Sequence, residues 1–268
     1  MWNIIRGELA KMRRCQILLV GIVALALCPV VQYGNQLIVE PEYRELNYDF
    51  ACLFANVIWG NTQIFLPISL VMIGGWLIDR ESVSDTLKNI VTVPVAMPCL
   101  LAAKLIVTGI LAVLFGIYSA GATLITGTLV GLPGLTPQLA LGSGFQVVAA
   151  ALTVYLVCMP MILIFGRIRG AYLGGSILTF FLGYSMLFFK SGLLLSAYPF
   201  SAALILVGFD MTKYNGATSP TNVSLALMGI CFIMIITIVL LVNSGRYGEA
   251  LARRTKKAKG GRRRNGRH

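Results

Sequence analysis

Long apolar runs separated by short polar segments dominate the sequence. A helix needs about 20 apolar residues to cross a hydrocarbon core about 30 Å thick. Runs near or above that length cover residues 15–32, 52–78, 101–125, 139–165, 171–189 and 223–242. Only 12% of the 268 residues are charged, whereas soluble domains carry about 25%. The pattern predicts an all-α integral membrane protein with six transmembrane helices between residues 15 and 243.

A further apolar stretch, residues 191–209, decides the topology. With six spans, 19 of the 22 Lys and Arg residues lie on the side of both termini and 3 on the other. Cytoplasmic loops are rich in Lys and Arg, so both termini are predicted to be cytoplasmic. A proline removes a backbone donor, and Pro199 therefore favours a break in this stretch. We predict a re-entrant segment at 191–209; the alternative is a tilted seventh span with the basic tail outside.

The two ends of the chain are basic. Residues 1–14 are expected to form an amphipathic interfacial helix, with Ile4, Ile5, Leu9 and Met12 on one face. Residues 244–268 form a basic tail, for which adhesion to anionic lipids is predicted. Nucleic-acid binding is not expected because no aromatic residues alternate with the basic ones. The side chains expected at the membrane surface are Arg6, Lys11, Arg13, Arg14, Arg253, Arg254, Lys256 and Lys257.

A polar segment between the second and third runs, residues 79–94, has its own helical pattern. Ser82 and Asp85 fit a capping box, in which each side chain pairs with a free backbone amide at the start of a helix. Val83, Leu87 and Ile90 would then share an apolar stripe. Two isolated turns do not stay helical in water. Either the bilayer surface or a cleft on a cytoplasmic partner must therefore hold this segment.

These features resemble a known family. The acidic Glu81, the run Thr86-Leu87-Lys88-Asn89, Pro94 and Lys104 match the pattern of the permease subunits of ABC exporters of the second type, in particular the bacitracin-resistance and lantibiotic-immunity branch. Asp85 stands where that family usually has glycine, and the Ser-Arg that usually follows the proline is missing. The similarity of layout extends over almost the whole chain.

The resemblance implies a coupling helix that docks on a dimer of ATP-binding subunits, a second permease subunit, identical or related, and a re-entrant pair of helices between the last two spans. ATP and Mg²⁺ would bind to the partner, because no Gly-Lys dipeptide occurs here and the phosphate-binding loop GxxxxGK[ST] is therefore absent. The expected coupling residues are Arg80, Glu81, Ser82, Val83, Asp85, Thr86, Leu87, Lys88, Asn89 and Ile90.

The sequence offers no catalytic or metal site. The only histidine is His268, so a Ser-His-Asp arrangement within the folded chain is excluded. Gly, Ser and Thr in the third and fifth runs favour close helix packing, with substrate contact as the alternative. For a cationic, amphipathic substrate, the possible outer surface consists of Glu40, Glu42, Glu45, Asp49, Tyr198 and Phe200.

Three functions stay open from sequence. The first is a permease subunit, not itself an enzyme, of an ATP-driven exporter that removes an antimicrobial peptide, a lantibiotic or a bacitracin-like compound, from a bacterial cell membrane. The second is the same exporter fold carrying a lipid or another compound. The third is a membrane scaffold or sensor that does not transport and uses residues 79–94 to bind a regulator.

Overall fold

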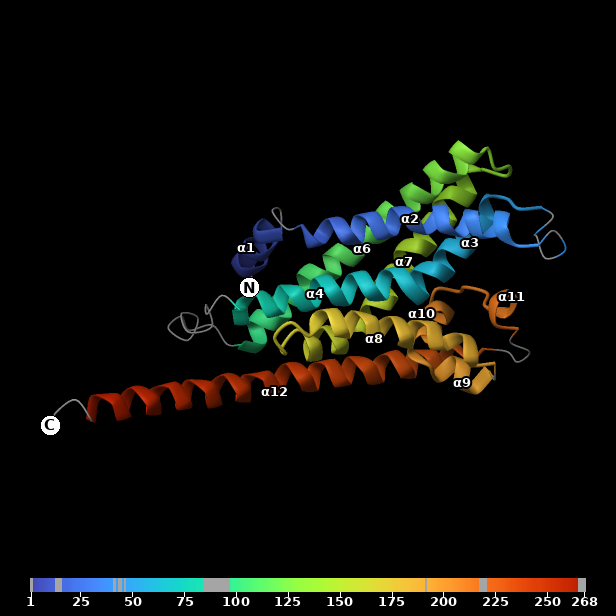
Figure 1. Ribbon diagram of the computed structural model, residues 1–268. Coiled ribbons are helices and arrows are strands. Elements are labelled where there is room, and N and C mark those ends of the chain that lie inside the picture. Colours follow the sequence, from blue (N-terminus) through green and yellow to red (C-terminus); the bar gives the residue numbers. More distant parts are fainter. Residues whose placement is uncertain are drawn as a thin grey trace.

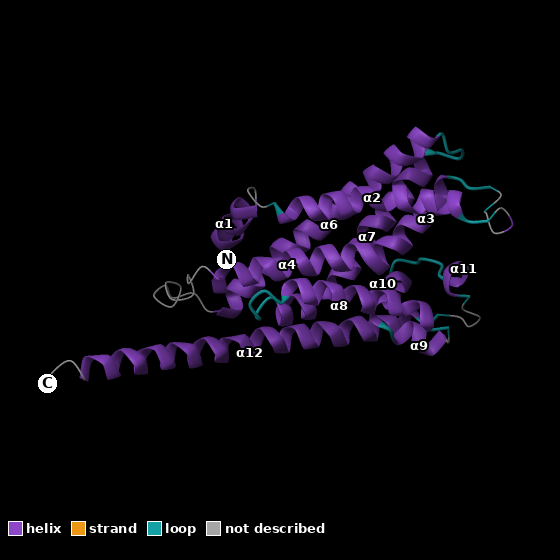
Figure 2. Ribbon diagram, viewed as in Figure 1, coloured by secondary structure: helices purple, strands orange, loops and turns teal. Residues whose placement is uncertain are grey.

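The computed structural model describes residues 2–12, 16–40, 42, 45, 47–83, 97–190, 192–216 and 221–264, without the side chains of 3, 4, 11, 81–83, 215 and 245–264. Over these residues the chain forms helices, turns and loops, and no strand (Figure 2). This agrees with the predicted all-α class.

The helices follow one another with short connections. The N-terminal part contains α1 (Trp2–Met12), α2 (Ile17–Ile38), α3 (Phe50–Gly60), the π-helix η2 (Asn61–Phe65), α4 (Leu66–Val83) and α6 (Met97–Val130). The C-terminal part contains α7 (Pro137–Phe165), α8 (Tyr172–Tyr184), the 3-10 helix η3 (Ser185–Phe188), α9 (Gly192–Ala197), α10 (Pro199–Leu206), α11 (Thr212–Asn215) and α12 (Val223–Arg264).

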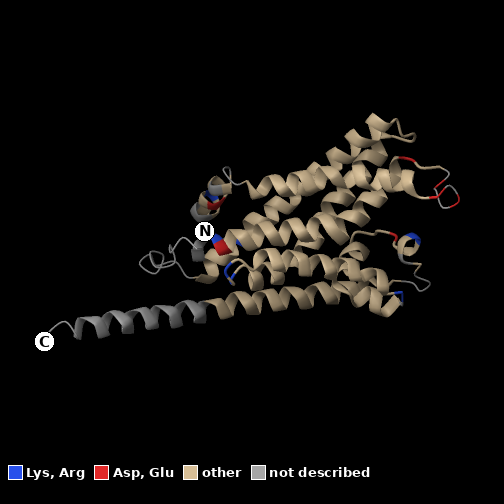
Figure 3. Cartoon of the chain, viewed as in Figure 1, with Lys and Arg blue, Asp and Glu red and all other residues tan. Residues whose placement is uncertain are grey.

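The long helices lie side by side, and successive helices run in opposite directions (Figure 1). We call one end of the bundle the terminal end; it holds α1, the last turn of α4, the first turns of α6 and the α7–α8 turn. The loop end lies opposite and holds the described residues between α2 and α3 (39, 40, 42, 45 and 47–49), the α6–α7 turn and α9 to α11. Charged residues with described side chains gather at these two ends (Figure 3).

Within the described residues, five helical stretches are long and apolar enough to cross a membrane. They are α2, the continuous α3–η2–α4 up to Arg80, α6, α7, and α12 up to Ser244. The fifth predicted span, 171–189, corresponds to a shorter apolar helix, Tyr172–Phe188, which packs alongside α4. The chain is therefore a multi-pass membrane protein.

Small residues bring several helices close together. A Cβ atom added to Gly116 of α6 would lie 2.8 Å from the Cα atom of Val148 in α7. One added to Gly175 of α8 would lie 2.4 Å from the Phe165 ring. By contrast, Gly121 of α6 has nothing within 4 Å of such an atom. Packing within the subunit therefore explains why Gly116 and Gly175 are glycines. It gives no such reason for Gly121.

The stretch 191–209 forms two short helices rather than one long one. Pro199 is the first residue of α10, where its missing amide proton costs nothing. Tyr198 precedes it in an extended conformation, and its hydroxyl donates to the Leu182 carbonyl of α8 at 2.5 Å. α10 packs against α12 and α7. The predicted break at Pro199 is present, and both helices lie at the loop end (Figure 1).

Candidate functional site

Helix α1 is attached to the terminal end of the bundle through one face. Ile5, Glu8 and Met12 are buried on that face, and α1 packs against α6. The spacing of three and four residues places these side chains on the same side of the helix. Leu9, which we expected on the apolar face, is 38% exposed. The buried face therefore includes an acid in place of one of the predicted apolar residues.

A buried ion pair fastens α1 to α6. The ammonium nitrogen of Lys104 lies 2.9 Å from Oε2 of Glu8, and the two side chains are 2% and 4% exposed. The same ammonium donates to the Leu77 carbonyl of α4 at 2.6 Å. Lys104 of α6 thus contacts both α1 and α4. Its partner in α1 is 96 residues away along the chain, and its partner in α4 is 27 residues away. Such a pair is held firmly only while both charges are present, because neither can regain water.

The last turns of α4 lie beside this ion pair. Asp79 is buried, and the guanidinium of Arg80 lies 5.3 Å from the centre of the Trp76 ring, within range of a cation–π interaction. α4 continues through Glu81 and Ser82 to Val83. Ser82 therefore lies inside α4 and does not begin a separate helix, which corrects the predicted capping position.

Most of the predicted coupling residues lie outside the part of the chain that the structure describes. They are Asp85, Thr86, Leu87, Lys88, Asn89 and Ile90. Arg13 and Arg14 of the predicted membrane surface lie outside it as well. The side chains of Lys11, Arg253, Arg254, Lys256 and Lys257 are not described either. Arg6 is exposed on α1. The two residues that flank the undescribed segment, Val83 and Met97, both belong to the terminal end.

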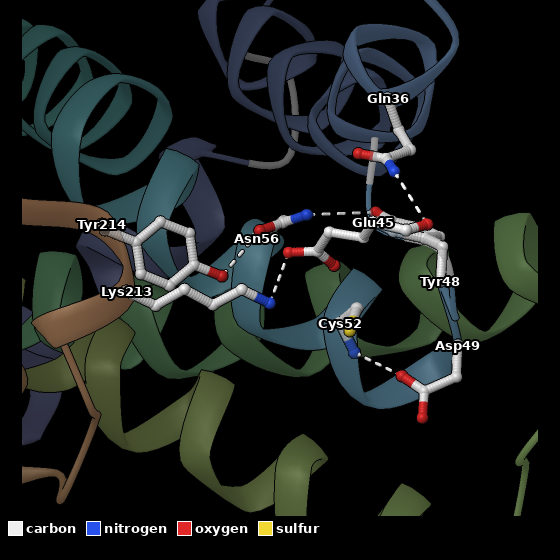
Figure 4. A network of polar contacts seen from close by, with 8 residues as sticks. All are labelled: Gln36, Glu45, Tyr48, Asp49, Cys52, Asn56, Lys213 and Tyr214. Carbon is white, nitrogen blue, oxygen red and sulfur yellow. Dashed lines mark hydrogen bonds and ion pairs between the residues drawn. The ribbon is translucent and has the colours of Figure 1, made fainter. Parts of the chain in front are cut away.

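A second polar cluster ties the loop end together (Figure 4). The Lys213 ammonium of α11 forms an ion pair with the Glu45 carboxylate of the first loop. Asn56 of α3 accepts a hydrogen bond from the Tyr214 hydroxyl at 2.6 Å and donates one to the Tyr48 hydroxyl at 3.2 Å. We call these five residues the loop clasp, because they connect the first loop, α3 and α11.

Aromatic rings extend the loop clasp into the bundle. The ring of Trp59 in α3 stacks on that of Tyr214 with centroids 4.8 Å apart and on that of Phe209 at 6.3 Å. Stacked aromatic pairs contribute about 0.5–1.5 kcal/mol beyond their buried area. The segment that follows α10 is thereby fixed to α3.

The predicted outer surface is only partly available at the loop end. Glu40 and Glu42 are exposed. Glu45 is paired with Lys213, and Asp49 caps α3 by accepting from the Cys52 amide at 2.8 Å. Phe200 is buried at 3% exposure, and Tyr198 is bonded to α8. In this conformation Phe200 is therefore a core residue and not a surface one.

The loop clasp should respond to alkaline pH. Burial raises the pKa of Tyr48 to about 12, against a smaller lowering by the Asn56 hydrogen bond, and the hydrogen bond with Glu45 raises the pKa of Lys213. A raised pKa means that the folded state holds its proton more tightly than the unfolded one. We therefore expect the clasp to keep its stability below pH 10 and to lose it between pH 10 and 12.

Absorbance of tyrosinate measures this directly. The difference between the titrations of the native chain and the Tyr48→Phe variant should give an apparent pKa of about 12 for Tyr48. A value close to 10 would mean that water reaches the hydroxyl and that the clasp is open in solution.

Sequence reasoning missed the pairing of Glu8 with Lys104. Both residues stand out in the sequence. Lys104 is an isolated charge inside the run 101–125, and Glu8 is the one acid in residues 1–14. An isolated charge inside a predicted span requires a partner of opposite sign. That requirement would have singled out Lys104, although not its partner 96 residues away.

Comparison with known proteins supports the resemblance at the level of the family. The family model described as ABC-2 family transporter protein matches residues 4–187. The matched range includes most of α1, both partners of the buried ion pair, the helices from α2 to α8 and most of η3. A search of curated proteins found no significant match.

Proposed function

Because this chain belongs to the ABC-2 family of transporter proteins, we propose that it is the permease subunit of an ATP-driven exporter that removes an antimicrobial peptide from the bacterial cell membrane. The family implies a transporter whose ATP-binding partner is a separate subunit. A lantibiotic or a bacitracin-like compound is the proposed class of substrate. ATP and Mg²⁺ would bind to the dimer of ATP-binding subunits, so that this chain transmits work and is not itself an enzyme.

The arrangement of the terminal end is the observation that supports this proposal most strongly. Residues 84–96 leave α4 at Val83 and return to α6 at Met97, and Lys104 holds both of these helices and α1 together. A force applied to residues 84–96 would therefore reach three helices at once. ATP would shift the equilibrium of the complex because it binds more tightly to the closed ATPase dimer.

The proposed topology has six spans with both termini in the cytoplasm. The helix Tyr172–Phe188 would be the fifth span, since 17 residues is the lower end of the length that crosses a bilayer. The terminal end would face the cytoplasm, in keeping with the positive-inside rule, and α9 and α10 would re-enter from outside. Anionic lipids would meet the basic residues of α1 and of the tail.

The proposed partners follow from the exposed surfaces. Large apolar side chains of α2 and α12, among them Val23, Leu27, Phe232 and Ile235, are exposed, and lipid or a second permease subunit, identical or related, would cover them. At the loop end, Glu40 and Glu42 are exposed. These carboxylates would attract a cationic peptide arriving from outside. No nucleic acid is expected.

Charge reversal in the proposed coupling helix tests the function. We expect the native chain to co-purify with an ATPase subunit and to raise the tolerance of cells to the peptide. Lys88→Glu and Leu87→Asp should abolish both, because they place an acid where a complementary cleft is proposed. Lys190→Glu reverses an exposed charge at the loop end and should leave both unchanged. An intact complex with Lys88→Glu or Leu87→Asp would contradict the coupling helix. An intact native complex that gives no tolerance would contradict the substrate class alone.

A further inference from the structure

One membrane-spanning stretch contains a π-helix at its middle. Between α3 and α4, the five residues Asn61–Phe65 form η2, in which the Leu66 amide bonds to the Asn61 carbonyl, five residues back. Single π-turns inside α-helices are rare and occur frequently at functional sites. The ring of Pro67, two residues after η2, lacks the amide proton that would bond to the Gln63 carbonyl. Pro67 therefore explains why the helix widens here.

The Gln63 carbonyl, to which Pro67 cannot donate, is also a point where α8 approaches closely. A Cβ atom added to Gly183 would lie 2.5 Å from the Gln63 carbonyl oxygen. Two residues later, at Ser185, α8 gives way to the 3-10 helix η3. Both helices therefore depart from α-helical geometry where they touch. Regular ridges-into-grooves packing does not require such a departure.

The polar side chains around η2 are incompletely paired. Asn61 donates to the Ser119 hydroxyl at 2.8 Å. Its own Oδ1, the Gln63 Nε2 and the Ser69 hydroxyl are buried with no hydrogen-bond partner among the described residues. These three residues are at most 5% exposed. Buried polar atoms are nearly always paired in stable structures, so unpaired ones mark a place where a second arrangement has something to gain.

The two halves of this span differ in one large contact. Both α3 and α4 pack against α2, α6 and α7, and α4 in addition packs along α8. α4 ends at the segment proposed to receive the ATPase, and α3 carries Asn56 and Trp59 of the loop end. A change of angle at η2 would move α4 and α8 together while α3 stays with the loop clasp.

We propose that η2 is the hinge through which movement of the coupling segment is converted into movement of α4 and α8 relative to α3. In the ATP-bound state the π-turn rearranges and the Asn61, Gln63 and Ser69 side chains find partners. Pro67 keeps the turn from closing into a regular helix, and Gly183 lets α8 pivot on the Gln63 carbonyl. This inference rests on the proposed function, since the ATPase supplies the movement.

Hydrogen exchange in the complex reconstituted with its ATPase tests the hinge. Exchange of amides 58–70 is compared in the nucleotide-free and the ATP-trapped states. We expect exchange in the native chain to differ about ten-fold between the two states, because a rearranging turn opens its backbone hydrogen bonds. Pro67→Ala restores the missing amide and should reduce that difference to less than about two-fold. Pro160→Ala removes the proline inside α7 and should leave the difference at its native size.

The coupling segment provides the internal reference. Amides 84–96 should be protected on binding of the ATPase in the native chain and in both variants. If they are protected while amides 58–70 exchange alike in the two nucleotide states, the hinge is wrong and the proposed function stands. If the native segment 84–96 gains no protection, the proposed function fails and the hinge fails with it. A native-sized difference in Pro67→Ala would also overturn the role given to Pro67.

Discussion

Replacement of Lys104 by methionine is expected to lower the free energy of unfolding by about 3–5 kcal/mol. Methionine has nearly the length of lysine, so the change removes the charge and leaves little empty space. The Glu8 carboxylate, with its side chain 4% exposed, would then be buried without this ammonium, and the Leu77 carbonyl would lose the hydrogen bond from Lys104. Chemical unfolding of the purified chain in detergent, followed by tryptophan fluorescence, measures the loss.

Two matched variants test whether the loss of stability comes from burying the Glu8 charge without Lys104. Lys213→Met removes the ion pair of the loop clasp, whose lysine side chain is 54% exposed, and should cost less than about 1 kcal/mol because water replaces the lost partner. The double variant Glu8→Met/Lys104→Met should be more stable than Lys104→Met alone, since the buried Glu8 carboxylate is removed together with the ammonium that balances its charge. If Lys104→Met costs no more than Lys213→Met, the ion pair does not hold α1 on the bundle.

The helical framework could be predicted because its signals are local. The run 139–165 corresponds to α7, Pro137–Phe165, and the start of the run 223–242 coincides with that of α12. Each run is long enough for membrane burial to fix helical structure whatever the neighbouring helices are, because backbone groups in lipid must be satisfied internally. Pro199 acts in the same local way, through its missing amide proton.

The contacts that assemble the ends of the bundle could not be predicted in the same way. The partner of Lys104 is 96 residues away, and that of Tyr214 is 158 residues away. A hydrophobic period describes which face of a helix is buried, but not which charge can share that face. For this reason the buried face of α1 was expected to hold Leu9 and not Glu8, and Phe200 was expected at the protein surface, although Glu8 and Phe200 are both buried.

The π-helix could have been anticipated only in part. Pro67 lies inside the run 52–78 and predicts an interruption of the backbone hydrogen bonds of that helix. Whether such a break becomes a kink, a π-turn or an end depends on what packs against it. Here Gly183 of α8 leaves room for the freed Gln63 carbonyl, and that contact between distant segments is absent from any local pattern.

Because of that contact, substitution of Gly183 by alanine is expected to destabilise the chain by about 1–3 kcal/mol. The added Cβ atom would lie 2.5 Å from the Gln63 carbonyl oxygen, and a backbone atom cannot move aside as the end of a side chain can. α8 would have to withdraw from η2. Chemical unfolding in detergent again measures the change, and exchange of amides 58–70 reports whether η2 is affected.

Gly174 provides the matched control in the same helix. A Cβ atom added there meets nothing within 4 Å, so Gly174→Ala should be neutral or stabilising by up to about 1 kcal/mol, the difference in helix propensity. Gly183→Ala gains the same propensity, and the difference between the two variants therefore isolates the contact with η2. Equal stability of both variants would mean that α8 can leave the Gln63 carbonyl without cost, and the close approach would then have no role in holding η2 in its π-helical form.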